Sequence, residues 1–174
     1  MMLIRQVLLL CMVTLIPALE LRASIPYGIL GNETWGISEG LMAWYSVAIT
    51  CIAFNMLLGW FLFWFLGPVF RLLEYIPPFR RLVEPVIERT RRKLAPYVEK
   101  YGELGVAVFI GIPLPGSGVY TGALGAFILG VDRRKFAIAN AIGVTIAGIL
   151  VTAITLALQQ GMQLPFWADI FLKE

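Results

Sequence analysis

Two long apolar segments without a charged residue constrain the fold of this chain more than any other feature. They cover residues 41–66 and 136–158. Because about 20 apolar residues cross the hydrocarbon core of a bilayer, each segment is long enough to form a transmembrane helix. Charged residues make up 14% of the chain, whereas soluble domains carry about 25%. The sequence therefore predicts an all-α integral membrane protein that is multi-pass.

The basic residues indicate which ends of these segments face the cytoplasm. Eight of the 14 Lys and Arg residues lie between positions 71 and 100, and three more form the cluster at 133–135. Cytoplasmic loops carry an excess of Lys and Arg, so both groups are predicted to be cytoplasmic. The apolar region between them, residues 104–131, then begins and ends on the same side of the membrane.

A break rich in proline and glycine divides this third apolar region into two arms. The break has the sequence P-L-P-G-S-G at residues 113–118. Neither arm approaches the length of about 20 residues that a single crossing needs. We therefore predict a re-entrant hairpin, in which both arms enter from the cytoplasm and the turn is buried in the membrane. The alternative is one kinked span that violates the charge rule.

The N-terminal region has a similar layout. Two apolar arms flank a polar, proline-containing break over residues 17–26, which holds Glu20 and Arg22. We predict a second broken hairpin here. One alternative is a cleavable signal peptide, for which Arg22 makes a poor cleavage site. Another is a single span, which Arg5 favours because it draws the N-terminus to the cytoplasm.

Together these segments predict two inverted repeats, each a re-entrant helical hairpin followed by a transmembrane helix. The first long helix runs inward and the second runs outward, as in many secondary transporters. Prolines in the basic segment predict several short interfacial helices there, in place of one long helix. A single membrane domain, residues 1–174, then consists of the first repeat at 1–66, a basic cytoplasmic interfacial linker at 67–100, the second repeat at 101–160 and an interfacial tail at 161–174.

The composition narrows the chemistry. The chain has no histidine, which removes the usual general base and the commonest zinc ligand. Cys11 and Cys51 lie in apolar runs without metal-ligand spacing, and we predict that both are packing residues. We expect no catalytic residues, no metal site, no cofactor and no enzymatic activity. The basic linker lies between hydrophobic segments, so its predicted partners are anionic membrane lipids and not nucleic acid.

Glu20 and Arg22 are the strongest candidates for a functional site. Ionisable residues inside a membrane are costly, and they usually mark a transport pathway or a charge pair. We predict that Glu20 carries a coupling proton and that Arg22 holds an anionic group or pairs with Glu20. The alternative is that both side chains lie at the membrane surface and have no functional role.

The second break adds further candidates. The helix that follows it would point its N-terminus into the membrane, and such ends bind anions. Alternatively, its glycines only permit a tight turn and close packing. Glu103 is either a second proton site or an ordinary interfacial charge. The predicted residues for substrate or proton binding are Glu20, Arg22, Pro26, Pro113, Pro115, Gly116, Ser117, Gly118, Tyr120 and Thr121.

Two short motifs carry a resemblance to a known family. E-L-R-A-S-I-P-Y-G at 20–28 resembles the ELRGAIP-type motif of the family named putative small multi-drug export proteins. Y-G-E-L-G at 101–105, followed by I-P-L-P-G-S-G at 112–118, resembles the second motif of that family. The resemblance covers about residues 15–158 and implies a location in the cell (cytoplasmic) membrane of a prokaryote. The family is similar in layout to the DedA and VTT membrane proteins, which have two re-entrant hairpins and are implicated in lipid translocation and proton-coupled transport.

These patterns predict a membrane transporter or lipid translocase that is coupled to protons. Its expected substrate is a small amphipathic or anionic molecule resembling a lipid phosphate. One alternative is a small multidrug efflux protein for cationic drugs, and another is a scaffold that binds anionic lipid or a partner protein without transport. Because so few spans enclose a cavity poorly, we expect a homodimer.

Overall fold

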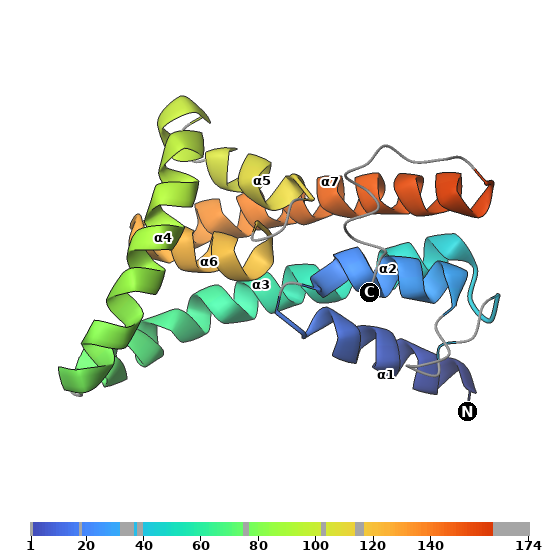
Figure 1. Ribbon diagram of the computed structural model, residues 1–174, viewed down its shortest axis with the longest axis horizontal. Helices are drawn as coiled ribbons and strands as arrows, with labels where there is room; N and C mark the ends of the chain where they lie inside the picture. The colour runs from blue at the N-terminus through green and yellow to red at the C-terminus, as the bar shows by residue number, and fades with distance from the viewer. Residues whose placement is uncertain are drawn as a thin grey trace. The chain divides into compact units, whose positions relative to one another are not determined.

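The computed structural model describes residues 2–17, 19–31, 37, 40–74, 77–101, 104–113 and 117–161. Within these residues the chain is organised as helices, which Figure 1 labels in order. They are α1 (Met2–Thr14), α2 (Glu20–Leu30), α3 (Trp44–Glu74), α4 (Pro77–Tyr101), α5 (Leu104–Gly111), α6 (Val119–Ile128) and α7 (Arg133–Gln159).

The helices are distributed over two compact units, which we describe separately. Unit 1 comprises residues 1–55 and 147–174, and therefore contains α1, α2, the beginning of α3 and the end of α7. Unit 2 comprises residues 56–146 and contains the rest of α3 and α7 together with α4, α5 and α6. Each unit thus combines one pair of short apolar helices with parts of the two long helices.

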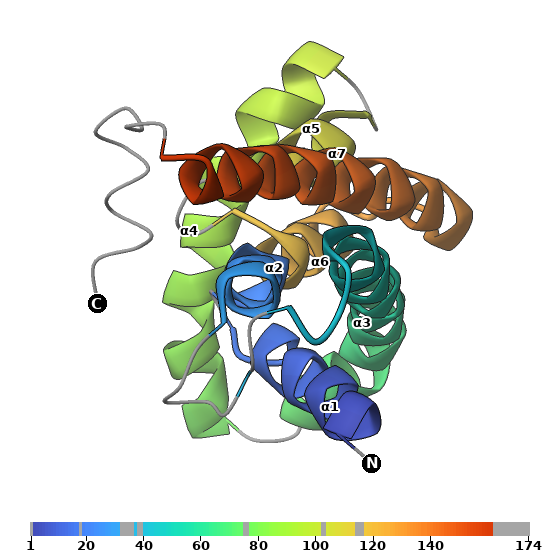
Figure 2. The ribbon, with the colours of Figure 1, turned by 90° about the vertical axis from the view of Figure 1, so that its right-hand side faces the viewer.

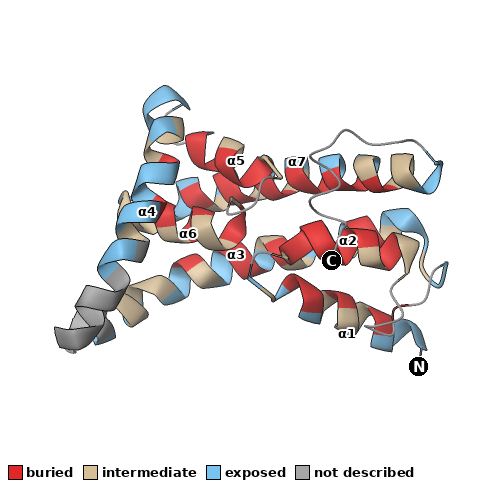
Figure 3. Ribbon diagram, viewed as in Figure 1, coloured by how far each residue is buried: buried red, intermediate tan, exposed pale blue. Residues whose placement is uncertain are grey.

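The two long helices confirm the prediction of two segments suited to crossing a membrane. The stretches Trp44–Phe70 and Arg133–Gln159 each have 27 residues and are long and apolar enough to span a bilayer. Large apolar side chains on α3, among them Trp60, Phe61 and Trp64, are exposed, as expected for a surface that faces lipid. The exposed and buried faces alternate along both helices in Figure 3.

Threonines inside α7 satisfy their hydroxyls within the helix itself. Thr145, Thr152 and Thr155 each donate a hydrogen bond to the backbone carbonyl four residues earlier, at 2.7 to 2.8 Å. A hydroxyl bonded in this way leaves no unsatisfied donor in hydrocarbon. These polar residues are therefore compatible with a membrane span.

In unit 1, α1 and α2 pack side by side as a helical pair, as Figure 1 and Figure 2 both show. They have 13 and 11 residues, so each is shorter than the roughly 20 residues of a membrane crossing. Gly28 of α2 permits this packing, because a side chain there would collide with Val47 and Leu10. The predicted hairpin of two short arms is thus present, and its entry into a membrane from one side stays a prediction.

The break between these arms is narrower than predicted. The first helix, α1, ends at Thr14, and α2 already begins at Glu20 and includes Arg22 and Pro26. The expected break at 17–26 was wrong at its C-terminal end, because Pro26 is accommodated inside the helix. Helices in membranes tolerate such a proline when neighbouring groups satisfy the carbonyl that loses its donor.

In unit 2, α5 and α6 form the second short pair, with 8 and 10 residues. The first of these helices ends at Gly111 and the second begins at Val119, so the predicted division of the region 104–131 is confirmed. A side chain at Gly122 would collide with Ile110, which shows how closely the two helices approach. Whether this pair is re-entrant is not decided by its length, and that interpretation stays a prediction.

An aromatic cluster ties the long helices of unit 2 to α6. The rings of Phe63 on α3 and Phe136 on α7 are stacked, with centroids 4.3 Å apart. Phe127 of α6 meets Phe63 edge to face, with centroids 6.0 Å apart. Such pairs contribute about 0.5–1.5 kcal/mol beyond the burial of their surface, so this cluster anchors α6 between the two long helices.

The basic segment differs from its prediction, because α4 is one continuous helix from Pro77 to Tyr101. Pro85 and Pro96 lie inside it and are both exposed. A proline removes one donor from the helix, and on an exposed face the freed carbonyl can be bonded by water. Several short helices were expected here, and the exposed position of both prolines explains why the helix continues through them.

Candidate functional site

The predicted site residues fall into two groups, one in each unit. Unit 1 holds Glu20, Arg22 and Pro26, which all lie on α2. Unit 2 holds the second group around the break between α5 and α6. Pro115, Gly116 and Glu103 lie outside the described residues. The described members of the second group are Pro113, Ser117, Gly118, Tyr120 and Thr121.

Glu20 and Arg22 are both buried at the start of α2. Their side chains are 3% and 8% exposed, so both are buried within the protein. Glu20 has a φ of 49°, in the left-handed region that a residue other than glycine seldom adopts. The side chain of Glu20 therefore leaves the backbone in a different direction from that of a residue in a regular helix. The Glu20 carboxylate acts electrostatically on the Arg22 guanidinium.

Two hydroxyls and a thiol form a buried polar cluster in the same unit. The Thr14 hydroxyl donates to the carbonyl of Leu10 at 2.8 Å and accepts from the Ser24 hydroxyl at 2.8 Å. The Cys51 thiol lies within hydrogen-bonding reach of both hydroxyls. Ser24 follows Glu20 by four residues on α2, so it lies one turn further along the helix. Sequence reasoning missed this cluster because its members come from three helices, although the i, i+4 spacing of Glu20 and Ser24 was a usable signal.

Cys11 and Cys51 are both free thiols. Cys51 is buried, as expected for a packing residue, but its neighbours Thr14 and Ser24 are polar. The first short helix pair therefore encloses charged, hydroxyl and thiol groups in an otherwise apolar setting. Such a setting can hold a proton, or a polar group of a ligand, away from bulk water.

The break in unit 2 is closed by its own residues. The Ser117 hydroxyl donates to the carbonyl of Ile112 at 2.7 Å, across the break. Gly118 has a φ of 117°, which a residue with a side chain rarely adopts. These features support the interpretation of a tight turn, and they give Ser117 and Gly118 structural roles that require no ligand.

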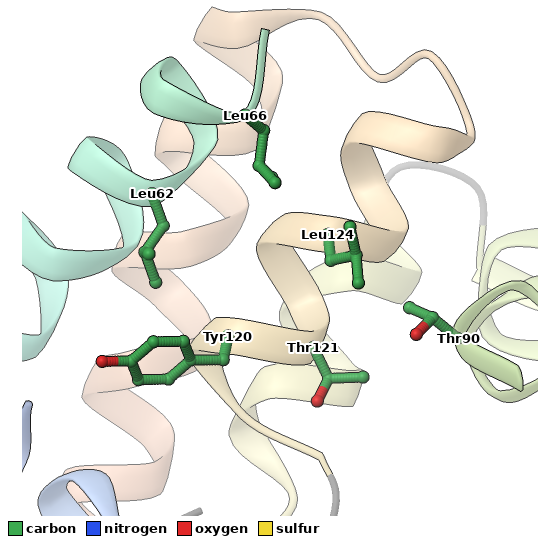
Figure 4. A pocket seen from close by; sticks show the side chains of 6 residues that line it. All are labelled: Leu62, Leu66, Thr90, Tyr120, Thr121 and Leu124. Atoms are coloured by element: carbon green, nitrogen blue, oxygen red, sulfur yellow. The ribbon is translucent and has the colours of Figure 1, made fainter. Parts of the chain in front are cut away.

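Tyr120 and Thr121 open onto a pocket of about 280 Å³, which Figure 4 shows from close by. Leu62 and Leu66 of α3 and Leu124 of α6 form its apolar walls. Thr90 of α4 adds a third hydroxyl-bearing residue. Sequence reasoning placed Tyr120 and Thr121 in a site but missed the other residues, which lie on distant parts of the chain.

Asn140 links the long helices in unit 2. Its side-chain amide donates to the carbonyl of Met56 at 3.0 Å, and Gly59 leaves room for it. Asn140 thus joins α7 to α3 within unit 2. The side-chain oxygens of Asn55 and Asn140 are buried without a hydrogen-bond partner among the described residues. In that part of the chain, no group of three or more acidic or cysteine side chains is placed to hold a metal ion.

Comparison with known proteins identifies the family. The family model described as "Putative small multi-drug export protein" matches residues 20–150, which is more than half of the 174 residues. Neither the curated proteins nor the solved structures that were compared include a match. The matched region contains α2 with its buried charges, all of α3 and residues 133–150 of α7, so it includes most of the two apolar helices that could cross a membrane. The chain belongs to the family of putative small multi-drug export proteins.

Proposed function

We propose that the chain is a proton-coupled transporter or lipid translocase of the cell membrane. Its substrate is a small amphipathic molecule with an anionic group resembling a lipid phosphate. Glu20 binds the coupling proton, and Arg22 binds the anionic group. The observation that carries this proposal is the burial of both charged side chains at the start of one apolar helix.

The opposite charges of Glu20 and Arg22 couple the binding of the proton to the binding of the anionic substrate. With Glu20 ionised, its charge compensates that of Arg22, on which it acts directly. Protonation of Glu20 removes the compensating charge and leaves a buried cation, which is costly in a medium of low dielectric constant. An anionic group of the substrate can replace the lost charge. The proton and the anion therefore stabilise each other's binding and move together.

The helix lengths support an alternating-access mechanism. The helices of both short pairs have 8 to 13 residues, as expected if each pair re-enters the membrane and two inverted repeats rock against each other. Tyr120 and Thr121 contribute hydroxyls on the side of the second repeat. A second copy of the chain, as a homodimer, would complete the wall of the pathway.

A second candidate function follows from the family description, which names multi-drug export. A cationic drug would bind the Glu20 carboxylate in exchange for a proton. In that case Arg22 would oppose binding of the drug, because its positive charge lies beside the same carboxylate. The two functions therefore make opposite predictions for the removal of Arg22.

The test is proton movement in proteoliposomes that contain the full chain and a pH-sensitive dye in the lumen. A gradient of a short-chain phosphatidic acid is imposed in one assay, and a gradient of ethidium in the other. We expect the phosphatidic acid gradient to drive protons, and both Glu20→Gln and Arg22→Gln to reduce the initial rate at least about tenfold, as losing one charged hydrogen-bonding group typically does.

Matched controls and a contrary result complete the test. Glu99→Gln and Arg92→Gln change the same charges at exposed positions of α4 and should leave the rate unchanged. Elution of each variant as a single species confirms that it is folded. Proton flux that responds to ethidium alone, survives Arg22→Gln and is lost in Glu20→Gln would establish the drug exporter instead. An unchanged phosphatidic acid response in Glu20→Gln would refute the assigned proton site.

A further inference from the structure

The charges of α4 are sorted into two stripes. Arg89, Lys93 and Lys100, together with Pro96, follow the spacing i, i+4, i+7 and i+11, which places them on one face of a helix. All four are exposed. This basic stripe contains no acidic residue, and it runs along the described part of α4 from its middle to its C-terminal turn.

The opposite flank carries acidic residues. Glu84, Glu88 and Glu99 fall on a second exposed stripe, which also contains Arg91 and Arg92. Between the two stripes lies the face with which α4 packs on α5 and α6, formed around Thr90 and Leu94. The described acidic residues of α4 are therefore confined to one mixed stripe, whereas the other stripe carries basic charges alone.

The orientation of α4 within unit 2 determines what its basic stripe faces. In Figure 1, α4 runs across α6 and the first part of α7, not alongside them. If α7 crosses the bilayer, α4 lies along the membrane plane, as amphipathic helices do at the interface. One flank of such a helix then meets lipid headgroups with basic side chains only, which favours anionic lipid at that flank.

The pocket described above lies beside this flank. Its wall includes Thr90, and Lys93 is one helical turn further along α4, next to Thr90 on the helix surface. Figure 4 shows Leu62, Leu66 and Leu124 directed into the space that Thr90 and Thr121 border. The volume of about 280 Å³ is near the lower end of ligand pockets, about 300 Å³, so it suits one acyl chain better than a whole lipid.

We propose that unit 2 contains a binding site for an anionic phospholipid. One acyl chain occupies the pocket between α3, α4 and α6, and the phosphate lies against Arg89 and Lys93. Thr90 and Thr121 supply hydroxyls near the level of the glycerol backbone. This site lies in a different unit from Glu20 and Arg22, and it requires the chain to be in a membrane but not to be a transporter.

The test measures lipid binding to the full chain in detergent, with phosphatidylglycerol and phosphatidylcholine titrated separately and followed by native mass spectrometry. The wild type should bind phosphatidylglycerol more tightly than phosphatidylcholine. Arg89→Gln/Lys93→Gln should weaken binding of phosphatidylglycerol at least about tenfold, because each basic residue near an anionic lipid surface contributes substantially to binding. The matched control Arg91→Gln/Arg92→Gln removes the same charge outside the basic stripe and should weaken it less than about threefold.

A second pair of variants tests the pocket. Leu124→Trp fills the space beside Thr121 and should weaken binding of both lipids, whereas Leu104→Trp on the exposed surface of α5 should not. Equal losses for the two charge variants would show diffuse attraction and overturn the site. Unchanged binding in Leu124→Trp would overturn the placement of the acyl chain. Neither result depends on whether Glu20 supports transport.

Discussion

The two pairs of short helices, α1 with α2 and α5 with α6, both pack closely, but they contain different kinds of side chain. The pair α1 and α2 encloses the charges of Glu20 and Arg22 and the bonded hydroxyls of Thr14 and Ser24. The pair α5 and α6 is held by glycines and by a turn that Ser117 closes. The difference indicates that the first pair carries the ionisable chemistry, whereas the second provides close packing and a pocket lined by hydroxyls and leucines.

The largest effect that would test this contrast concerns the charge pair. Arg22→Met leaves Glu20 buried beside an apolar side chain, and breaking a buried pair in this way costs about 3–5 kcal/mol. The double variant Glu20→Gln/Arg22→Met should be more stable than Arg22→Met, because no isolated charge remains. Thermal unfolding in detergent, followed by circular dichroism, measures both.

Glu88 and Arg92, two exposed residues spaced i, i+4 on α4, serve as the control. Replacing one of them should cost less than about 1 kcal/mol, since interactions between exposed charges contribute little. If Arg22→Met and Arg92→Met were equally stable, the buried electrostatics of the first helix pair would not distinguish it from the rest of the chain.

A smaller loss of stability is expected when a glycine of either helix pair is replaced by alanine, and its size should differ between the two pairs. A side chain at Gly105 of α5 would meet the backbone of Tyr97, whereas one at Gly28 of α2 would meet the side chains of Val47 and Leu10. Because a backbone cannot move aside as a side chain can, Gly105→Ala should cost about 1–3 kcal/mol or more, and Gly28→Ala less than Gly105→Ala. Stability measured as above compares them.

Gly67 provides a control for these substitutions. No atom other than those of its chain neighbours lies within contact distance of a side chain added there, and it is inside α3 directly before Pro68. Alanine has the higher helix propensity, but a side chain before proline is disfavoured in a helix, so Gly67→Ala should change the stability by less than about 1 kcal/mol in either direction and less than Gly105→Ala does. Equal destabilisation by Gly105→Ala and Gly28→Ala would remove the proposed difference in packing.

The smallest expected effect concerns the hydrogen bonds of single hydroxyls. Thr14→Val removes the buried bonds of this hydroxyl to Ser24 and to the carbonyl of Leu10, whereas Ser117→Ala removes the bond to Ile112 that closes the break. Bonds of this kind contribute about 0.6–2 kcal/mol in membrane proteins, and the buried bonds should matter more than the partly buried one. A larger loss for Ser117→Ala, measured by unfolding, would mean that the turn contributes more than the polar cluster does.

The features that depend on local sequence were predictable. The uncharged runs identify α3 and α7, and the proline- and glycine-rich break at 113–118 separates α5 from α6. The sequence also drew attention to Glu20 and Arg22 as ionisable residues inside an apolar region, although it did not predict their burial within the protein.

Features that depend on tertiary contacts were not predictable. The continuity of α4 depends on Pro85 and Pro96 lying on its exposed face, which the position of a proline in the chain does not reveal. The cluster of Thr14, Ser24 and Cys51 joins three helices. The pocket likewise draws its walls from α3, α4 and α6, and no local pattern links residues so far apart.

Side-specific cysteine labelling in intact cells tests the proposed architecture most directly. In a variant that lacks Cys11 and Cys51, single cysteines are introduced by Lys100→Cys, Lys135→Cys and Gln160→Cys, at exposed positions. We expect positions 100 and 135 to react only from the cytoplasm, and position 160, beyond the end of α7, to react only from outside. Reaction of positions 100 and 135 from opposite sides would show that the intervening region spans the membrane and would contradict the two inverted repeats.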